Sequence, residues 1–257
     1  MKRVFLRIAY DGTNYCGWQI QENGITVEQV INEKLTELLN EKIAVIGASR
    51  TDSGVHALGN VAVFDTETRI PAEKISFALN QRLPEDIRIQ ESKEVPADFH
   101  PRHCDSQKTY EYKILNRRFA VPTERLYSHF VYMPLNVEKM KTAAGYLVGE
   151  HDFKSFCSSR SQVENTVRTI YGLEITKEGD MIHMLICGNG FLYNMVRIIA
   201  GTLIKVGLNI YPPEHVQEII EARDRKAAGP KAAACGLTLV EIRYEEENEL
   251  KEIAADQ

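Results

Sequence analysis

The sequence predicts an α+β protein made of two halves, each with the order β-α-β-β-α-β. Alternating apolar segments, which are typical of strands, and segments of helical periodicity follow one another in this order twice along the chain. A length of 257 residues allows two ordinary domains or one large one. The expected sheets are mixed and largely antiparallel, with the halves packed side by side and a cleft between them. A single α+β domain of another topology is the alternative.

Residues 1–105 are expected to form the first half. Residues 26–40 have helical periodicity, with apolar side chains on one face and with Thr26 and Gln29 placed as a capping box. Pro71 suits the first turn of a second helix that runs to about Leu83. The strands of this half are expected at 4–10, 43–48, 60–66 and 86–95.

Residues 106–257 are expected to form the second half, with the boundary near Cys104–Lys108. Asn136 is placed as the N-cap of a helix over 136–148, and Pro212 opens a short extra helix. Residues 191–207 predict a strongly amphipathic helix. The acidic tail, 245–257, is expected to be a solvated end. The strands are expected at 108–115, 167–176, 181–188 and 237–244.

This order of elements is that of ferredoxin-like or RNA-recognition-like units. Apolar content of 44% and charged content of 26% are ordinary for a globular protein and argue against wholesale disorder. No apolar run is long enough to span a bilayer. The five cysteines are scattered and odd in number, which favours reduced thiols. We therefore expect a soluble cytoplasmic protein without a membrane partner.

The charge distribution leaves a nucleic-acid partner open. The tail 245–257 holds six acidic residues and one lysine, which accounts for the whole net charge of −5. The rest of the chain is neutral overall and can still gather its basic side chains along one surface.

The segment "GASRTDSGVHALG" (47–59) places Arg50 and Asp52 in a run of small residues. Its glycines predict a compact, exposed loop after a strand. Taken alone, Asp52 would be expected to cap a turn and Arg50 to be solvated. Two other segments add to the interest of this loop. Arg197 lies on a helix face outside the apolar stripe, and Tyr110 lies on a predicted strand, where RNA-binding sheets stack a base.

With these segments the chain resembles a known family. "GASRTDSGVHALGNVAVF", "FHPR", "KTYEYKI", "GEHDFKSFC", "GNGFLYNMVRIIAGTLIKVG" and "ACGLTLVEIRY" occur in this order. They are similar to motifs of the TruA family of tRNA pseudouridine synthases, from about Val4 to Tyr244. The resemblance implies an isomerase without a cofactor that acts on uridines 38, 39 and 40 in the anticodon stem-loop of tRNA. It also implies a homodimer with one tRNA lying across both subunits.

The resemblance also implies roles for individual residues. Asp52 matches the catalytic nucleophile, and Arg50 precedes it. Arg197 matches the arginine that pairs with the catalytic carboxylate, Tyr110 the tyrosine that contacts the target nucleotide, and Leu237 a leucine that lines the pocket. A free aspartate is already ionised at neutral pH, so Arg197 is better explained as aiming Asp52 than as ionising it. Ser49 and Ser53 replace the commoner glycine and alanine of the family loop.

Phosphate contacts would complete the binding of tRNA. The basic side chains that we expect to supply them are Arg102, Lys108, Arg117, Arg160 and Arg168.

Two further groups of residues, at 100–104 and at His56, have a catalytic or metal-binding interpretation as well as a structural one. His100, His103 and Cys104 lie close together, but no second ligand pair has suitable spacing, so no metal is expected. His56 could serve as a general base, although a hydrogen-bonded structural histidine is the stronger expectation. The rival functions are a non-catalytic RNA-binding module, which has no use for Asp52, and a hydrolase that uses Asp52 with His56.

Overall fold

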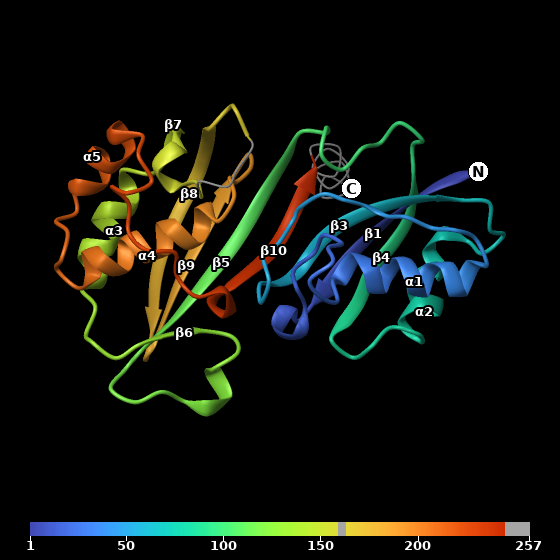
Figure 1. Cartoon of the computed structure of the whole chain (residues 1–257), viewed down its shortest axis with the longest axis horizontal. Helices are drawn as coiled ribbons and strands as arrows, with labels where there is room; N and C mark the ends of the chain where they lie inside the picture. Colours follow the sequence, from blue (N-terminus) through green and yellow to red (C-terminus); the bar gives the residue numbers. More distant parts are fainter. Residues whose placement is uncertain (159–162, 245–257) are drawn as a thin grey trace, which may run out of the picture. The chain divides into compact units, whose positions relative to one another are not determined.

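The computed structural model describes residues 1–158 and 163–244, and it divides them into two compact units. Among the described residues, unit 1 comprises Met1–Ser106 together with 239–244, and unit 2 comprises Gln107–Thr238. The described residues contain ten strands and five α-helices, so the predicted α+β class is confirmed (Figure 1). None of these described helices is long and apolar enough to cross a bilayer. The predicted acidic tail lies outside the described residues.

Unit 1 has the expected β-α-β-β-α-β order. Its strands pair antiparallel in the order β4-β1-β3, with β2 on β3. The helices α1 and α2 come between strands in the positions that the sequence predicts. The bounds are β1 Lys2–Tyr10, α1 Val27–Leu39, β2 Ile46–Gly47, β3 His56–Thr66, α2 Ala72–Asn80 and β4 Ile87–Val95.

The strand β10 (Leu237–Tyr244) was expected in the second half, but its residues from Leu239 onward belong to unit 1. There β10 lies next to β3 in the sheet. The Tyr244 ring packs edge to face against Phe99 at a centroid distance of 5.1 Å, and its hydroxyl donates to the Pro101 carbonyl at 2.9 Å. These apolar and hydrogen-bonding contacts explain why the end of β10 packs in unit 1.

The helix α1 begins as predicted, but its neighbouring strand is much shorter than expected. Thr26 accepts a hydrogen bond from the Gln29 backbone N–H, which is one half of the predicted capping box. The apolar segment 43–48 forms only the two-residue β2. The reason lies in α1, because side chains of that helix accept the backbone N–H groups of Ile43 and Val45 that a longer strand would have paired.

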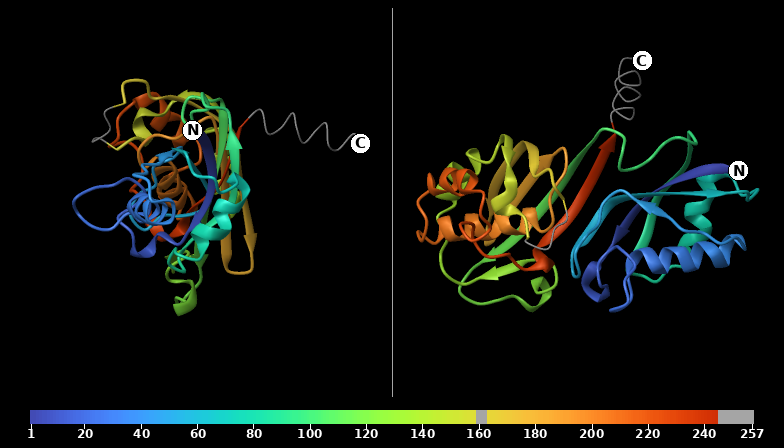
Figure 2. Two further views of the ribbon diagram at one scale, coloured as in Figure 1. Left: turned by 90° about the vertical axis from the view of Figure 1, so that its right-hand side faces the viewer. Right: turned by 45° about the horizontal axis from the view of Figure 1, so that its top comes forward.

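Unit 2 has the predicted strands and helices with two short strands added. Its sheet has the order β5-β9-β8-β7, and β6 pairs in parallel with β5. Its helices gather on one side of the sheet (Figures 1 and 2). The bounds are β5 Ser106–Asn116, β6 His129–Val131, α3 Val137–Gly145, β7 Gly149–Asp152, β8 Val167–Glu178, β9 Met181–Gly188, α4 Met195–Gly207 and α5 His215–Ala222.

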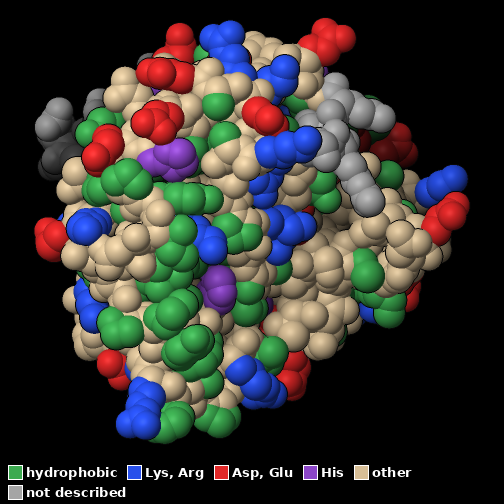
Figure 3. Space-filling view, turned by 60° about the vertical axis from the view of Figure 1, so that its left-hand side comes forward, with side chains coloured by type: hydrophobic (Ala, Val, Ile, Leu, Met, Phe, Trp, Pro, Cys, Tyr) green, Lys and Arg blue, Asp and Glu red, His purple; other side chains and the backbone are tan. Residues whose placement is uncertain are grey.

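Unit 2 also exposes large apolar side chains between β5 and α3. Phe119 keeps 66% and Tyr132 64% of its surface exposed, and Tyr127, Phe130 and Met133 are exposed as well. Figure 3 shows hydrophobic side chains gathered on the lower part of one face of the molecule. Isolated exposed apolar residues are ordinary on a protein surface, and here five of them lie within fifteen positions.

Candidate active site

The Arg-Thr-Asp segment alternates between buried and exposed side chains. Ser49 and Thr51 are buried, with 6% and 8% of their surface exposed, whereas Arg50 is exposed and Asp52 is partly exposed. Ser49 and Thr51 therefore point into unit 1, whereas the charged side chains of Arg50 and Asp52 point outward.

Two buried polar side chains hold the inward residues. The Tyr10 hydroxyl at the end of β1 lies 2.7 Å from the Thr51 hydroxyl. Asn60 on β3 donates from Nδ2 to the Ser49 carbonyl at 3.1 Å. Buried polar groups cost free energy unless they are hydrogen-bonded, so both contacts favour this one placement of the loop.

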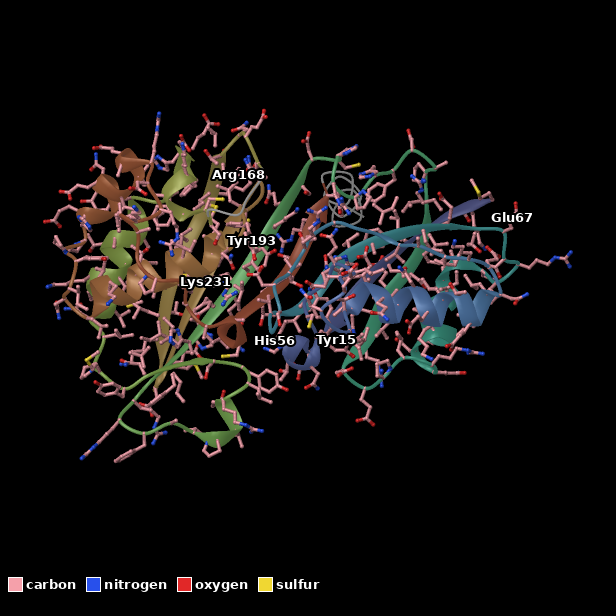
Figure 4. The ribbon with its side chains drawn as sticks, viewed as in Figure 1. Tyr15, His56, Glu67, Arg168, Tyr193 and Lys231 are labelled. Carbon is pink, nitrogen blue, oxygen red and sulfur yellow. The ribbon has the colours of Figure 1, made fainter. Side chains whose placement is uncertain are left out.

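The segment 12–18 packs against the other side of the loop. The Trp18 backbone N–H donates to the Thr51 carbonyl at 3.1 Å, and the Ser53 hydroxyl donates to the Tyr15 carbonyl at 3.1 Å. Gly17 has φ +84°, and a Cβ there would lie 2.5 Å from the Thr51 carbonyl oxygen, so only glycine permits this approach. Figure 4 labels Tyr15 of this segment. We call residues 12–18 the brace.

His56 follows the loop and is 5% exposed. Its Nδ1 accepts the Gly12 backbone N–H at 3.1 Å, and the Asp11 carboxylate lies 3.1 Å from the same nitrogen. Figure 4 labels His56 beside the brace. This hydrogen bond connects His56 to the brace. It is the structural role that the sequence favours for His56, in preference to a role as general base.

Arg197 lies in the first turn of α4 and is 9% exposed. Its Nε donates to the Ala232 carbonyl at 2.9 Å, and its NH1 donates to the Asn194 side-chain oxygen at 3.3 Å. Asn194 has a left-handed backbone, with φ +63°, and its Nδ2 donates to the Ser158 hydroxyl at 2.8 Å. A guanidinium has five N–H donors in a fork that fits a carboxylate, so a buried arginine held in this way can orient one.

The helix that carries Arg197 begins at Met195, four residues later than the sequence predicts. The left-handed Asn194 directly before it is incompatible with a continuing α-helix, which explains the difference.

The strand β5 places two tyrosines on one face, as predicted. Tyr110 is only 7% exposed, and its ring packs edge to face against Phe191 at 5.2 Å. Tyr112 is fully buried, and its hydroxyl donates to the Ala233 carbonyl at 2.8 Å. Burial raises the pKa of Tyr112, so this hydroxyl stays protonated. Tyr110 is therefore a packed side chain and not an open stacking platform.

Leu237 begins β10 and is 6% exposed. The segment that leads to it passes both Arg197 and Tyr112, because Ala232 bonds to the first and Ala233 to the second. In unit 2, the segment that precedes Leu237 thus lies beside Arg197. Arg50 and Asp52 lie together in unit 1, and the meeting of the two sets stays a prediction.

The basic residues predicted to contact phosphate have different surroundings. Arg102 donates from Nε to the Gly47 carbonyl at 2.7 Å, so it holds the start of the Arg-Thr-Asp loop. Arg117 forms an exposed ion pair with Asp180 at 3.3 Å. Arg168 lies on β8, where burial lowers its pKa (Figure 4). Lys108 lies on β5, and Arg160 is outside the described residues.

The histidine pair of the "FHPRHC" segment is stacked. The rings of His100 and His103 lie 3.9 Å apart at 18°, and burial with nearby positive charges lowers the pKa of His100. Within the described parts of the chain, no group of three or more His, Cys, Asp or Glu side chains is placed to hold a metal ion.

Sequence reasoning missed the residues that fix the loop: Tyr10, Asn60 and the brace. A signal was available, because "YDGTNYCGW" ends the first strand on an aromatic residue and follows it with two more aromatic residues and two glycines. Such a pattern indicates close backbone packing, but it does not say against which segment.

Comparison with known proteins identifies the family. The family model for tRNA pseudouridine synthase matches residues 7–103 and 143–245. The tRNA pseudouridine synthase A of Ruminiclostridium cellulolyticum is 51% identical over 245 residues, and that of Thermoanaerobacter sp. is 49% identical over 244 residues. Each alignment covers 95% of this chain and 100% of the relative.

Among solved structures, that of a Cbf5-Nop10-Gar1 complex aligns with a TM-score of 0.37 and 14% identity. It covers 90% of this chain and 47% of that one, and a likeness this slight carries no argument.

Matches that extend over most of the chain define the class of protein as an RNA-modifying isomerase rather than a passive binding module. The chain belongs to the tRNA pseudouridine synthase family. The predicted family and class of enzyme are therefore confirmed, and the RNA-binding module is not favoured.

Proposed function

We propose that this chain converts uridine to pseudouridine at positions 38, 39 and 40 in the anticodon stem-loop of tRNA, with Asp52 as the nucleophile. The observation that carries the proposal is the alternation in the Arg-Thr-Asp segment, where buried Ser49 and Thr51 present Arg50 and Asp52 outward. A carboxylate on a loop fixed from two sides meets the demand of a reaction that needs one well-aimed anion.

The reaction breaks the bond between ribose C1′ and uracil N1 and forms a bond between C1′ and C5. The hydrogen at C5 leaves as a proton, and N1 takes up a proton in its place. Asp52 acts as a nucleophile on the sugar or on the base, or it stabilises the detached sugar. The uracil rotates before C5 bonds to C1′. The substrate and product are isomers, so no co-reactant is consumed. Arg50, the exposed neighbour of Asp52, is placed to contact the RNA around the reacting nucleotide.

The target uridine must leave the base stack, which costs a few kcal/mol. We propose that Tyr110 and Leu237 line the pocket that receives it and that Arg197 orients the Asp52 carboxylate. The hydrogen bonds from Arg197 to Ala232 and Asn194 support this role, because they fix the guanidinium before substrate binds.

Contacts with tRNA phosphates provide binding free energy that offsets base flipping. Arg102, Lys108, Arg117, Arg160 and Arg168 are the proposed donors. The affinity for tRNA should fall as the salt concentration rises, with a shallower slope in alanine variants of these residues.

The enzyme that we propose is a cytoplasmic homodimer. A cytoplasmic location accords with tRNA as the substrate. The exposed apolar side chains between Phe119 and Met133 support a contact between copies. Sedimentation equilibrium of the full chain should give the mass of a pair, and a monomer at micromolar concentration would contradict this part of the proposal.

The test uses tRNA labelled with tritium at uracil C5, with uridine only at positions 38, 39 and 40 of the anticodon arm. The wild-type chain should release tritium to water because C1′ replaces the hydrogen at C5. Asp52→Asn keeps the size of the side chain and removes its charge, so it should release none above background. Release by Asp52→Asn at the wild-type rate would refute the role of Asp52, and free uracil among the products would favour the hydrolase.

A further inference from the structure

We infer that Tyr10 is a positioning residue for the reaction, because its hydroxyl holds Thr51 and so sets the direction of Asp52. The inference rests on the proposed function of Asp52. Family motifs in the sequence draw attention to Asp52 and Arg50, whereas Tyr10 is the last residue of a different strand, about forty positions earlier.

The backbone of β1 is irregular where it delivers Tyr10. The pairing of β1 with β3 shifts register between Ile8 and Tyr10, and the pairing of β1 with β4 shifts between Arg7 and Ile8. Bulges of this kind turn a side chain away from its regular direction and are common beside active sites. The irregularity therefore places the Tyr10 ring beneath the loop and not simply on one face of the sheet.

The ring of Tyr10 is fixed by packing. It is 4% exposed and lies 6.0 Å from the ring of Trp18, which is 1% exposed. Phenylalanine would fill the same space, so the hydroxyl is the only part of the side chain that packing does not require. That hydroxyl lies 2.7 Å from Thr51 Oγ1.

The consequence for Asp52 follows from the chain. Thr51 immediately precedes Asp52, and the Asp52 carbonyl accepts the Val55 N–H at 3.1 Å, so the two sides of Asp52 are held separately. Asn60 donates to the Tyr10 hydroxyl at 3.4 Å as well as to the Ser49 carbonyl, which links both inward residues in one network. Loss of the Tyr10 hydroxyl would release the Thr51 side chain while the Thr51 carbonyl stays bonded to the Trp18 N–H, so the backbone would turn about that bond and change the direction of the Asp52 side chain.

The test compares Tyr10→Phe with a matched control, Tyr244→Phe. Both hydroxyls are in unit 1, on side chains 4% and 2% exposed, and the Tyr244 hydroxyl donates to the Pro101 carbonyl at 2.9 Å. Both variants should lower the melting temperature by similar amounts. Only Tyr10→Phe should lower kcat for tritium release, by about fivefold or more, with KM changed less than about twofold, because a misaimed group slows the chemical step and not binding.

A double-mutant cycle tests the route through Thr51. Thr51→Val removes the hydroxyl at constant size and should lower kcat as much as Tyr10→Phe does. The variant with both changes should be no slower than either alone. Thr51→Ser restores the hydroxyl and should recover most of the rate.

Three outcomes would overturn the inference: an unchanged kcat in Tyr10→Phe, equal kcat losses in Tyr10→Phe and Tyr244→Phe, or independent effects in the double variant. Asp52→Asn is assayed in parallel. If it stays active, the proposed function fails and the inference fails with it. If it is inactive while Tyr10→Phe keeps full kcat, the inference alone fails.

Discussion

Substitution of Gly12 by alanine tests how closely the brace approaches the Asp52 loop. A Cβ on Gly12 would lie 1.9 Å from the Val55 carbonyl oxygen, whereas ordinary contacts begin at 3.4 Å. One of the two segments must therefore move by about 1.5 Å, the difference between these distances. Forced insertion of a methyl group into packed structure costs about 1–3 kcal/mol. In a chain of this size, each kcal/mol lowers the melting temperature by about 2–4 °C.

The catalytic effect of Gly12→Ala should be larger than the effect on stability. Val55 donates its N–H to the Asp52 carbonyl, so a shift of Val55 reaches the proposed nucleophile directly. A misplacement of about 1 Å can cost 100-fold in rate. We expect tritium release to fall by about that factor, with tRNA affinity in a filter-binding assay nearly unchanged.

Gly145→Ala is the control for this experiment. Gly145 is the exposed last residue of α3, and a Cβ there would meet no atom within 4 Å. The substitution should leave activity unchanged and stabilise unit 2 by up to about 1 kcal/mol. Full activity of Gly12→Ala alongside a lowered melting temperature would refute the dependence of the loop on the brace. An unchanged melting temperature would refute the close approach itself.

Three further predictions concern unit 2. Arg197→Lys keeps the charge but loses the planar fork, so kcat should fall at least about tenfold in the tritium assay, and full activity would contradict the orienting role. Tyr112→Phe leaves the Ala233 carbonyl without its buried donor and should lower the free energy of unfolding in urea by about 1–3 kcal/mol. Burial lowers the pKa of His129, so the unfolded chain takes up this proton first as the pH falls. The free energy of unfolding should therefore decrease below about pH 6.5, and His129→Gln should reduce that dependence.

Elements with strong local signals could be predicted from the sequence. The start of α1 follows from Thr26, which accepts the Gln29 N–H, and the strand 237–244 agrees with β10 to the residue. Both depend on side-chain patterns within a few positions. Elements that depend on distant partners were missed or misplaced. The three-residue β6 is defined by its parallel pairing with β5, and the apolar run 43–48 gives the backbone N–H groups of Ile43 and Val45 to side chains of α1.

The candidate site divides in the same way. Arg50, Asp52 and Arg197 stand out in the sequence because charged residues are unusual among small or apolar neighbours. The residues that hold the Arg-Thr-Asp loop do not stand out in the sequence. Tyr10 and Asn60 look like ordinary strand residues, and only the structure shows that they bond to Thr51 and Ser49. The left-handed Asn194, which both delays α4 and binds Arg197, is also a property of the backbone that residue type alone does not indicate.

The most direct test of the central claim is a single-turnover measurement with Asp52→Glu. This variant keeps the carboxylate and its charge but lengthens the side chain by one methylene. If the loop aims one carboxylate at the reacting nucleotide, tRNA should bind with unchanged affinity while the rate of tritium release falls about 100-fold or more. A rate within a few fold of wild type would show that the position of the carboxylate does not matter and would contradict the account.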